Sequence, residues 1–152
     1  MAQWSMPVKS LAQIKVAQAF FSQILSIPSE EKYEMPGQHY MADMFSVLRK
    51  NSERPIEDVQ KMWDIITYHF LIGNTDGHIK NFSMLYSPDL KSKGLAPAYD
   101  IVSAVIYSGI RKNMSFSIGG EYAFEKIKRI NFEKAANEIG LGKSMLMKRF
   151  DN

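Results

Sequence analysis

The chain has 152 residues, of which 45% are hydrophobic and 23% are charged. This length suits one domain with a substantial core, so a single domain over residues 1–152 is expected. The formal net charge of +3 is too small to indicate a nucleic-acid partner by itself. The absence of cysteine excludes disulfide bonds and thiolate–metal sites and suits a cytoplasmic protein. No hydrophobic run is long enough to predict a membrane span.

Hydrophobic periodicity predicts two helices in the first third of the chain. Residues 9–27 carry hydrophobic side chains at three- and four-residue steps, and Pro28 ends that pattern. The stretch PSEEKYEMPGQ that follows has the composition of a loop. Residues 39–50 place hydrophobic side chains on one face and so predict a second helix: Met41, Met44, Phe45 and Leu48.

A longer helix is expected between residues 55 and 72. It is hydrophobic on more than one side, which is typical of a central, buried helix. Ser52 is the candidate N-cap, Pro55 suits the first turn, and Gly73 suits the end. The hydrophobic side chains of this helix that we expect in the core are Ile56, Val59, Met62, Trp63, Ile66 and Phe70.

The middle of the chain predicts strands. Residues 82–86 are typical of a short strand, and residues 87–94 are rich in turn formers. Pro97 keeps the residue before it extended, so Asp100 is expected on a loop where a strand gives way to a helix. Residues 114–120 predict a further strand or extended segment.

Two helices are expected near the end of the sequence. The first covers residues 131–139, with Asn131 at its start and Gly140 after its end. The second covers residues 143–150. The predicted fold class is therefore mainly α with a small β-hairpin.

The loop NTDGHIKNF, residues 74–82, concentrates side chains suited to phosphoryl transfer. Magnesium with nucleotide phosphates needs carboxylate or amide oxygens, and the acceptor hydroxyl needs a carboxylate to take its proton. Asp76 and Asn81 have the Asp-x-x-x-x-Asn spacing of a kinase catalytic loop, and Asp100 follows the predicted hairpin. This order predicts Asp76 as the general base and Asn81 and Asp100 as ligands of Mg²⁺. His78 and Lys80 lie where they can meet the transferred phosphoryl group.

The segments YHFLIGNTDGHIKNFSMLY, LAPAYDIVSAVIY and MSFSIGGEY resemble the C-terminal lobe of the HipA-type toxin kinases. The resemblance covers about residues 15–140 and implies a protein-kinase-like C-lobe. It also implies a bacterial serine/threonine kinase of a toxin–antitoxin system that uses ATP and Mg²⁺. By this resemblance Asp76 matches the catalytic Asp, and Asn81 and Asp100 match the metal-binding residues. His78 matches the residue that replaces the lysine of ordinary kinases.

The resemblance further implies partners. Family members are proposed to phosphorylate translation factors such as aminoacyl-tRNA synthetases, and a helix-turn-helix antitoxin restrains them. Contact with DNA is therefore expected only through the antitoxin. The sequence contains no Gly-x-Gly-x-x-Gly loop of the kind that covers ATP phosphates, so we expect the N-lobe to be absent. The chain is then a truncated gene product, one piece of a split kinase, or a lone C-lobe whose partner supplies the rest, so a separate N-lobe chain is one expected partner among these alternatives. ATP binding by this chain alone is expected to be weak.

Three other readings remain open from the sequence. The chain is a non-catalytic interaction module if it is a kinase remnant that docks an antitoxin or a separate lobe. His69, Asp76 and His78 are a conceivable zinc site, although they lack a helical His-x-x-x-His pair. Residues 132–150 have the outline of a helix-turn-helix, but three consecutive hydrophobic side chains leave few polar groups to read bases: Met145, Leu146 and Met147.

Overall fold

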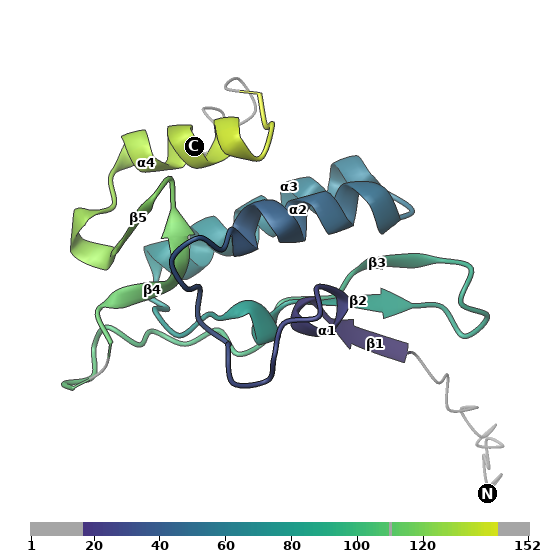
Figure 1. Ribbon diagram of the computed structural model, residues 1–152, viewed down its shortest axis with the longest axis horizontal. Helices are drawn as coiled ribbons and strands as arrows, with labels where there is room; N and C mark the ends of the chain where they lie inside the picture. The colour runs from purple at the N-terminus through teal and green to yellow at the C-terminus, as the bar shows by residue number, and fades with distance from the viewer. Residues whose placement is uncertain (1–16, 110, 143–152) are drawn as a thin grey trace, which may run out of the picture.

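The computed structural model describes residues 17–109 and 111–142 (Figure 1). In chain order the helices and strands are β1 Ala17–Phe20, α1 Phe21–Ile24, α2 Tyr40–Asn51, α3 Pro55–Leu71, the 3₁₀ turn η1 Ile79–Asn81, β2 Ser83–Tyr86, β3 Lys93–Leu95, β4 Asn113–Ile118, β5 Glu121–Ala123, the 3₁₀ turn η2 Phe124–Lys126 and α4 Arg129–Glu138.

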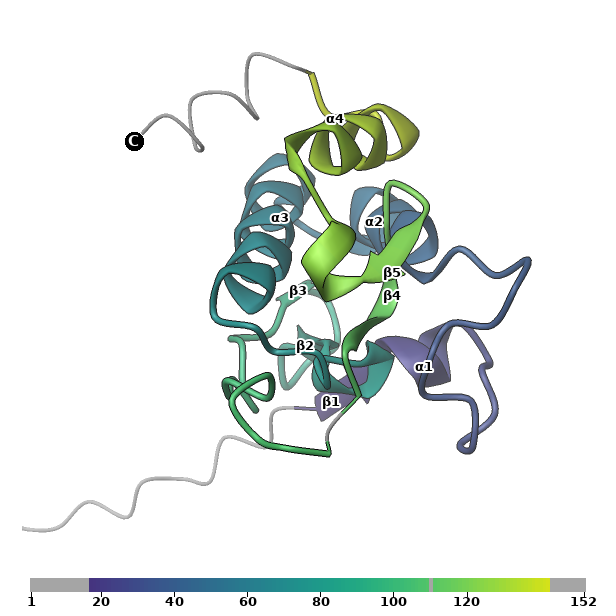
Figure 2. The same ribbon diagram turned by 90° about the vertical axis from the view of Figure 1, so that its left-hand side faces the viewer.

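Helices α2 and α3 form the middle layer of the molecule. Two views at right angles show α4 on one side of this pair and the sheet of β1, β2 and β3 on the other (Figures 1 and 2). Helix α4 packs through Phe132, whose ring lies 5.9 Å from that of Trp63 and 5.1 Å from that of Phe70. In the described ranges, no helix is both long and apolar enough to cross a bilayer.

The two central helices agree closely with the sequence prediction. All four side chains predicted for the hydrophobic face of α2 are buried, and so are four of the six predicted for α3. Phe70 is only partly buried, and the prediction of Ile56 as a core residue is wrong because 72% of it is exposed.

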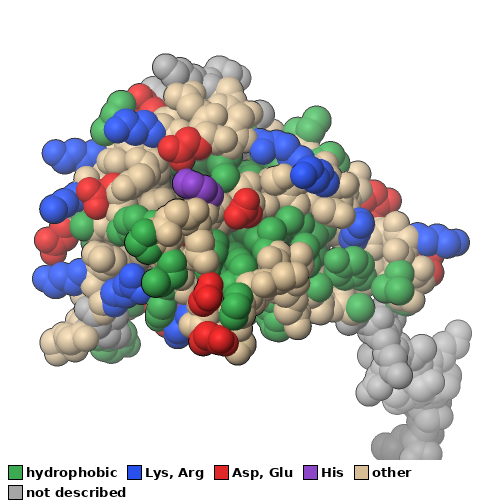
Figure 3. All heavy atoms as spheres, viewed as in Figure 1, with side chains coloured by type: hydrophobic (Ala, Val, Ile, Leu, Met, Phe, Trp, Pro, Cys, Tyr) green, Lys and Arg blue, Asp and Glu red, His purple; other side chains and the backbone are tan. Residues whose placement is uncertain are grey.

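Figure 3 shows hydrophobic side chains that remain exposed between charged ones on one face of the molecule.

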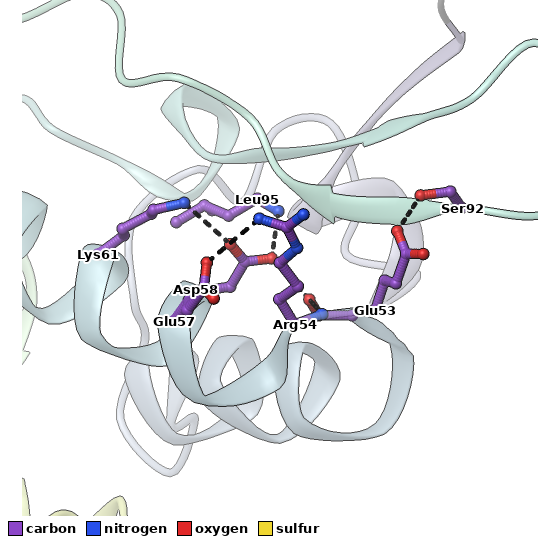
Figure 4. Close-up of polar contacts among 8 residues, drawn as sticks. Glu53, Arg54, Glu57, Asp58, Lys61, Ser92 and Leu95 are labelled. Carbon is purple, nitrogen blue, oxygen red and sulfur yellow. Dashed lines mark hydrogen bonds and ion pairs between the residues drawn. The ribbon is translucent and has the colours of Figure 1, made fainter.

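The junction between α2 and α3 differs in detail from the prediction. Ser52 is the C-cap of α2, whereas the N-cap of α3 is Arg54. The Ser52 hydroxyl accepts a hydrogen bond from the Arg54 N–H at 3.0 Å and donates one to Oδ2 of Asp58 at 2.6 Å. The same carboxylate oxygen accepts the Leu95 N–H at 2.8 Å (Figure 4). Asp58 is 5% exposed, so one buried carboxylate joins the first turn of α3 to β3.

The first sheet has the order β1-β2-β3, and both pairings are antiparallel. Strand β2 confirms the prediction for residues 82–86. The helix predicted over residues 9–27 is wrong where β1 lies, and within the described part of that range only α1 is helical. Ala17 lies opposite Tyr86 in the ladder, so a pairing with a distant segment outweighs the local helical pattern. The part of the predicted helix before residue 17 lies outside the described residues.

A second sheet of two strands, β4 and β5, confirms the strand predicted near residues 114–120. With two antiparallel sheets the fold is mixed α/β, and the expectation of a mainly α chain with one hairpin underestimates its strands. Helix α4 begins two residues before the predicted start, and Asn131 Oδ1 accepts the Lys128 N–H at 2.9 Å. Gly140 follows the helix with a φ of 66°, as expected. The helix predicted over 143–150 lies outside the described residues.

The helix expected after Asp100 is absent, because residues 101–109 form neither helix nor strand. This segment instead wraps around the end of α3. The carbonyl oxygen of Gly73 accepts the N–H groups of Ala104 at 3.0 Å and Val105 at 3.1 Å. The wrapping leaves a run of hydrophobic side chains exposed: Ile101, Val102, Val105, Ile106 and Tyr107.

Candidate active site

The loop that carries the predicted site begins at a well-defined helix end. Gly73 has a φ of 69°, and its N–H donates to the Phe70 carbonyl at 3.0 Å. The Asn74 N–H donates to the His69 carbonyl at 2.8 Å. This pair of bonds is the Schellman arrangement that closes a helix with glycine in the left-handed conformation. It fixes the direction in which residues 74–82 leave α3.

Asp76 is exposed on this loop and is held by its neighbours. The Tyr33 hydroxyl donates a hydrogen bond of 2.6 Å to Oδ1 of Asp76. The preceding residue, Thr75, is buried, and its carbonyl accepts the Ser115 hydroxyl at 2.8 Å. The Asp76 side chain borders a hollow of ≈ 330 Å³, which is also lined by Tyr33, Thr75, Val102, Ala104, Tyr107 and Arg111.

A buried carboxylate next in the chain fixes Tyr33. Glu34 Oε2 accepts the Tyr40 N–H at 2.8 Å, and Oε1 accepts the Ser117 N–H at 3.1 Å and the Tyr122 hydroxyl at 2.6 Å. Burial, together with this bond to Glu34, raises the pKa of Tyr122 to about 12. Because every one of these donors is directed at the carboxylate, Glu34 anchors the loop around residues 28–38 to α2 and to the β4–β5 hairpin.

Asn81 and Asp100 meet although 19 residues separate them in the sequence. The Asn81 amide nitrogen Nδ2 donates to Oδ2 of Asp100. Its amide oxygen Oδ1 is buried and has no hydrogen-bond partner among the described residues. Asp100 is exposed and has a φ of 56°, and its carbonyl accepts Nδ2 of Asn74 at 3.1 Å. The structure therefore brings the Asn81 amide group and the Asp100 carboxylate into direct contact.

His78 is a half-buried residue of the same loop. Burial lowers the pKa of His78 below its usual value of 6.5, and the negative charges of Asp76 and Asp100 act in the opposite direction. Both carboxylates are therefore close enough to influence the same imidazole. The edge of the Tyr33 ring also faces His78, with 5.9 Å between ring centres. His78 is thus a half-buried group whose neutral form is favoured.

Lys80 is placed apart from these side chains. Its ammonium group donates to the carbonyl oxygen of Ser29, on the loop that also carries Tyr33. Its own carbonyl accepts the Tyr99 hydroxyl at 2.6 Å. Lys80 therefore joins the loop to its surroundings, and its charge is directed at a backbone oxygen.

The donor set fits magnesium and does not fit zinc. Mg²⁺ is commonly held by one or two protein oxygens, with phosphate and water completing the octahedron, and Asn81 Oδ1 with the Asp100 carboxylate meets that need. Within residues 17–109 and 111–142, no three His, Cys, Asp or Glu side chains gather around one point. His69 is 3% exposed and packs on the Phe82 ring at 5.6 Å. A zinc site of His69, Asp76 and His78 is therefore wrong.

The sequence prediction missed three residues that shape this site. Asn74 is the first residue of the predicted loop, and the sequence pattern assigns it no role, although an amide two residues before the proposed base is a local signal. Tyr33 and Glu34 reach the site from a segment predicted only as a loop, and nothing in their immediate sequence indicates this.

Comparison with known proteins identifies the family of the chain. The family model described as the HipA-like C-terminal domain matches residues 8–152. The Sinorhizobium fredii protein Y4mE is 34% identical over 138 residues, which are 91% of this chain and 32% of that protein. The serine/threonine-protein kinase toxin HipA of Shewanella oneidensis is 26% identical over 106 residues, which are 68% of this chain and 23% of that protein.

A solved structure shares the fold. HipA of Shewanella oneidensis, in a complex with HipB and its operator DNA, aligns with a TM-score of 0.78 at 22% identity. The alignment covers 86% of this chain and 33% of that chain, so this chain spans about a third or less of the length of these relatives. Because the family match extends over almost all of the sequence, the chain belongs to the family of HipA-like C-terminal domains.

Proposed function

We propose that this chain is the catalytic, protein-kinase-like C-lobe of a HipA-type serine/threonine kinase from a toxin–antitoxin system. In this proposal it transfers the γ-phosphoryl group of ATP to a Ser or Thr hydroxyl of a protein. The observation that carries the proposal is the pairing of Asn81 with Asp100 beside a loop that exposes Asp76. The kinship with the HipA toxin kinase of Shewanella oneidensis supports it.

Each side chain then has a role that its surroundings suit. Tyr33 occupies Oδ1 of Asp76, and Oδ2 has no hydrogen-bond partner among the described residues, so it is available to accept the proton of the acceptor hydroxyl. Asn81 and the Asp100 carboxylate would hold Mg²⁺. When bound, Mg²⁺ neutralises negative charge on the ATP phosphates. His78 serves as a neutral hydrogen-bonding group, because burial lowers its pKa. The Lys80 ammonium donates to the Ser29 carbonyl, and its remaining N–H groups could contact the phosphoryl group.

Most of the affinity for ATP is proposed to come from residues outside this sequence. This chain spans about a third or less of its relatives, and a phosphate-covering loop with its strand lysine is needed for firm binding. We therefore propose that an N-lobe outside these 152 residues completes the site and that these residues alone bind Mg-ATP weakly. Calorimetry tests this point, because micromolar affinity of the isolated chain would contradict it.

The partners follow from the same kinship. The Shewanella HipA structure contains HipB and operator DNA, so we propose a helix-turn-helix antitoxin as a partner here, with DNA reached only through it. The substrate is proposed to be a translation factor, such as an aminoacyl-tRNA synthetase, in the bacterial cytoplasm. Its phosphorylation would slow growth and favour persistence.

Phosphoryl transfer from radiolabelled ATP tests the proposal. The wild-type chain is assayed with Mg²⁺ in the presence and absence of the neighbouring gene product, beside the variants Asp76→Asn and Asp43→Asn. Asp43 is an exposed residue of α2 and serves as the matched control. We expect Asp76→Asn to lose about 100-fold or more of the rate, the range for a lost general base. Full activity in Asp76→Asn would overturn the proposal.

A non-catalytic interaction module is the second candidate. It is favoured by the exposed hydrophobic run from Ile101 to Tyr107, which borders the site and is typical of a surface that another protein covers. If this is the function, antitoxin or N-lobe binding survives in Asp76→Asn, and no phosphoryl transfer is found even with the neighbouring gene product present.

A further inference from the structure

Asn74 has no part in the mechanism above, yet it touches Asp100. The side chain is 1% exposed, and its Nδ2 donates to the Asp100 carbonyl at 3.1 Å. The Asn74 backbone is itself fixed, since its N–H closes the end of α3 on the His69 carbonyl at 2.8 Å. The amide group is therefore presented from a rigid helix end.

Asp100 has a backbone conformation that needs such support. Its φ of 56° lies in the left-handed region, which residues other than glycine adopt uncommonly, although Asp and Asn tolerate it best. This conformation determines where the carboxylate points. Oδ2 of Asp100 accepts a hydrogen bond from the Asn81 amide nitrogen. A change to extended backbone at Asp100 would turn the carboxylate away from Asn81.

The segment after Asp100 is held by the same short piece of chain. The Gly73 carbonyl accepts the N–H groups of Ala104 and Val105. Gly73 and Asn74 thus hold residues 100–105 at two points, and the Asn74 side chain makes the contact that reaches Asp100. Replacing only this side chain would leave the other anchor in place.

We infer that Asn74 is a positioning residue: it holds Asp100 in the left-handed conformation and so aims its carboxylate, beside Asn81, at one divalent cation. This inference rests on the proposed function, in which Asn81 and Asp100 bind Mg²⁺. Groups that orient a metal ligand typically change metal affinity by about 10-fold to 100-fold when they are removed. We expect a loss of this size in Asn74→Ala.

Binding of Mn²⁺, used in place of Mg²⁺, gives a test that needs no enzymatic activity. The full chain is labelled with ¹⁵N, and Mn²⁺ is added while the paramagnetic broadening of the Asn81 and Asp100 amide signals is followed. The coupling between the amide and α protons of Asp100 reports its φ in the same samples. Asn74→Ala should need at least about 10-fold more Mn²⁺ for equal broadening, and its coupling at Asp100 should change.

Two further variants make the test specific. Asn74→Leu keeps roughly the size of the residue but lacks the donor and adds no charge, so it should behave like Asn74→Ala even if the alanine variant folds poorly. Asn51→Ala is the control, because Asn51 also donates its Nδ2 to a backbone carbonyl, that of Val47 at 3.0 Å, but on α2. It should match the wild-type chain.

The outcomes separate this inference from the proposed function. If the wild-type chain responds to Mn²⁺ at Asn81 and Asp100 and both Asn74 variants respond at the same concentration with unchanged coupling, the inference is overturned alone. If neither signal of the wild-type chain responds, the proposed metal site is overturned and the inference with it.

Discussion

The hydroxyl of Tyr33 is bonded to Oδ1 of Asp76 at 2.6 Å across 43 residues of sequence. Two cations also lie over the ring, because the Arg111 guanidinium carbon is 4.4 Å from the ring centre and Lys32 Nζ is 4.9 Å from it. With Glu34 anchoring the neighbouring backbone, Tyr33 has little freedom to leave Asp76. The geometry predicts that Tyr33 holds the proposed base in one orientation.

Tyr33→Phe should lower kcat for phosphoryl transfer by about 10-fold to 100-fold and leave the KM for ATP unchanged. The variant removes one hydrogen bond to a charged group, a contribution of about 1.5–3 kcal/mol, but keeps the ring and its contacts. Tyr33 has no hydrogen bond to Asn81 or Asp100, so nucleotide binding should not respond. Steady-state kinetics with varied ATP separate kcat from KM.

Tyr68→Phe is the control for this prediction, since Tyr68 is half exposed on α3 and its hydroxyl has no hydrogen-bond partner among the described residues. The effect of Tyr33→Phe should also disappear when Asp76 is already Asn, because the hydroxyl acts only through that carboxylate. A drop of equal size in both backgrounds would contradict a positioning role.

Two histidines should make the protein less stable in mild acid. Burial lowers the pKa of both His69 and His78 below the usual value of 6.5, which applies in the unfolded chain. As the pH falls below that value, the unfolded chain takes up protons before the folded one does, so the free energy of unfolding decreases. The decrease is at most about 1.4 kcal/mol per pH unit for each proton and ends once the folded state is protonated too.

Urea unfolding at about pH 7.5 and about pH 5.5 measures this difference. His69→Phe removes the buried titrating group and keeps an aromatic ring against Phe82, so the stability difference between the two pH values should shrink. His39→Phe is the control, because His39 is exposed at the start of α2. An unchanged difference in His69→Phe would show that burial of His69 does not disfavour its charged form.

Asp58→Ala should lower the free energy of unfolding by about 2–4 kcal/mol. Asp58 accepts hydrogen bonds from Ser52 and from the Leu95 N–H, and its removal leaves that N–H without this acceptor (Figure 4). Asp43→Ala, at an exposed site on α2, should change stability by less than about 0.5 kcal/mol. Chemical denaturation checks both. Equal, small effects would mean that Asp58 does not join α3 to β3 in solution.

Gly73→Ala should destabilise the protein more than Gly37→Ala does. Both glycines have positive φ, so both substitutions share the backbone strain of about 1 kcal/mol. A Cβ at Gly73 would also collide with the Val105 side chain, whereas a Cβ at Gly37 would meet nothing within 4 Å. The difference in unfolding free energy therefore isolates the packing of residues 101–109 on the helix end. Equal destabilisation by the two substitutions would show that residues 101–109 shift easily to make room for the Cβ.

The sequence predicts well those elements that are determined locally. Helices α2 and α3 have strong periodic patterns and clear ends, and both were expected within one residue of their observed bounds. Strand β1 could not be predicted in this way, because the residues from Ala17 to Phe20 continue a helical pattern. Their strand conformation depends on hydrogen bonding to β2, which lies more than 60 residues later.

In the candidate site, too, the residues that could be predicted are those whose association is visible in the sequence itself. Asp76 and Asn81 share one loop and have an interpretable spacing, so their association could be predicted. The contact between Asn81 and Asp100 required the order of motifs and was expected from it. Tyr33 and Glu34 could not be predicted, because their roles arise only when the loop around them folds against β4.

The geometry around Asp100 depends on the length of α3, because Gly73 and Asn74 stand at the Schellman end of that helix. An α-helix rotates by about 100° and rises about 1.5 Å for each residue. Inserting one residue in the middle of α3 would therefore swing its last turn to another side of the axis and carry both anchors of residues 100–105 with it. An added residue in the exposed turn between β2 and β3 would not displace these anchors. Changes in chain length should thus be tolerated in the hairpin turn and excluded from this helix.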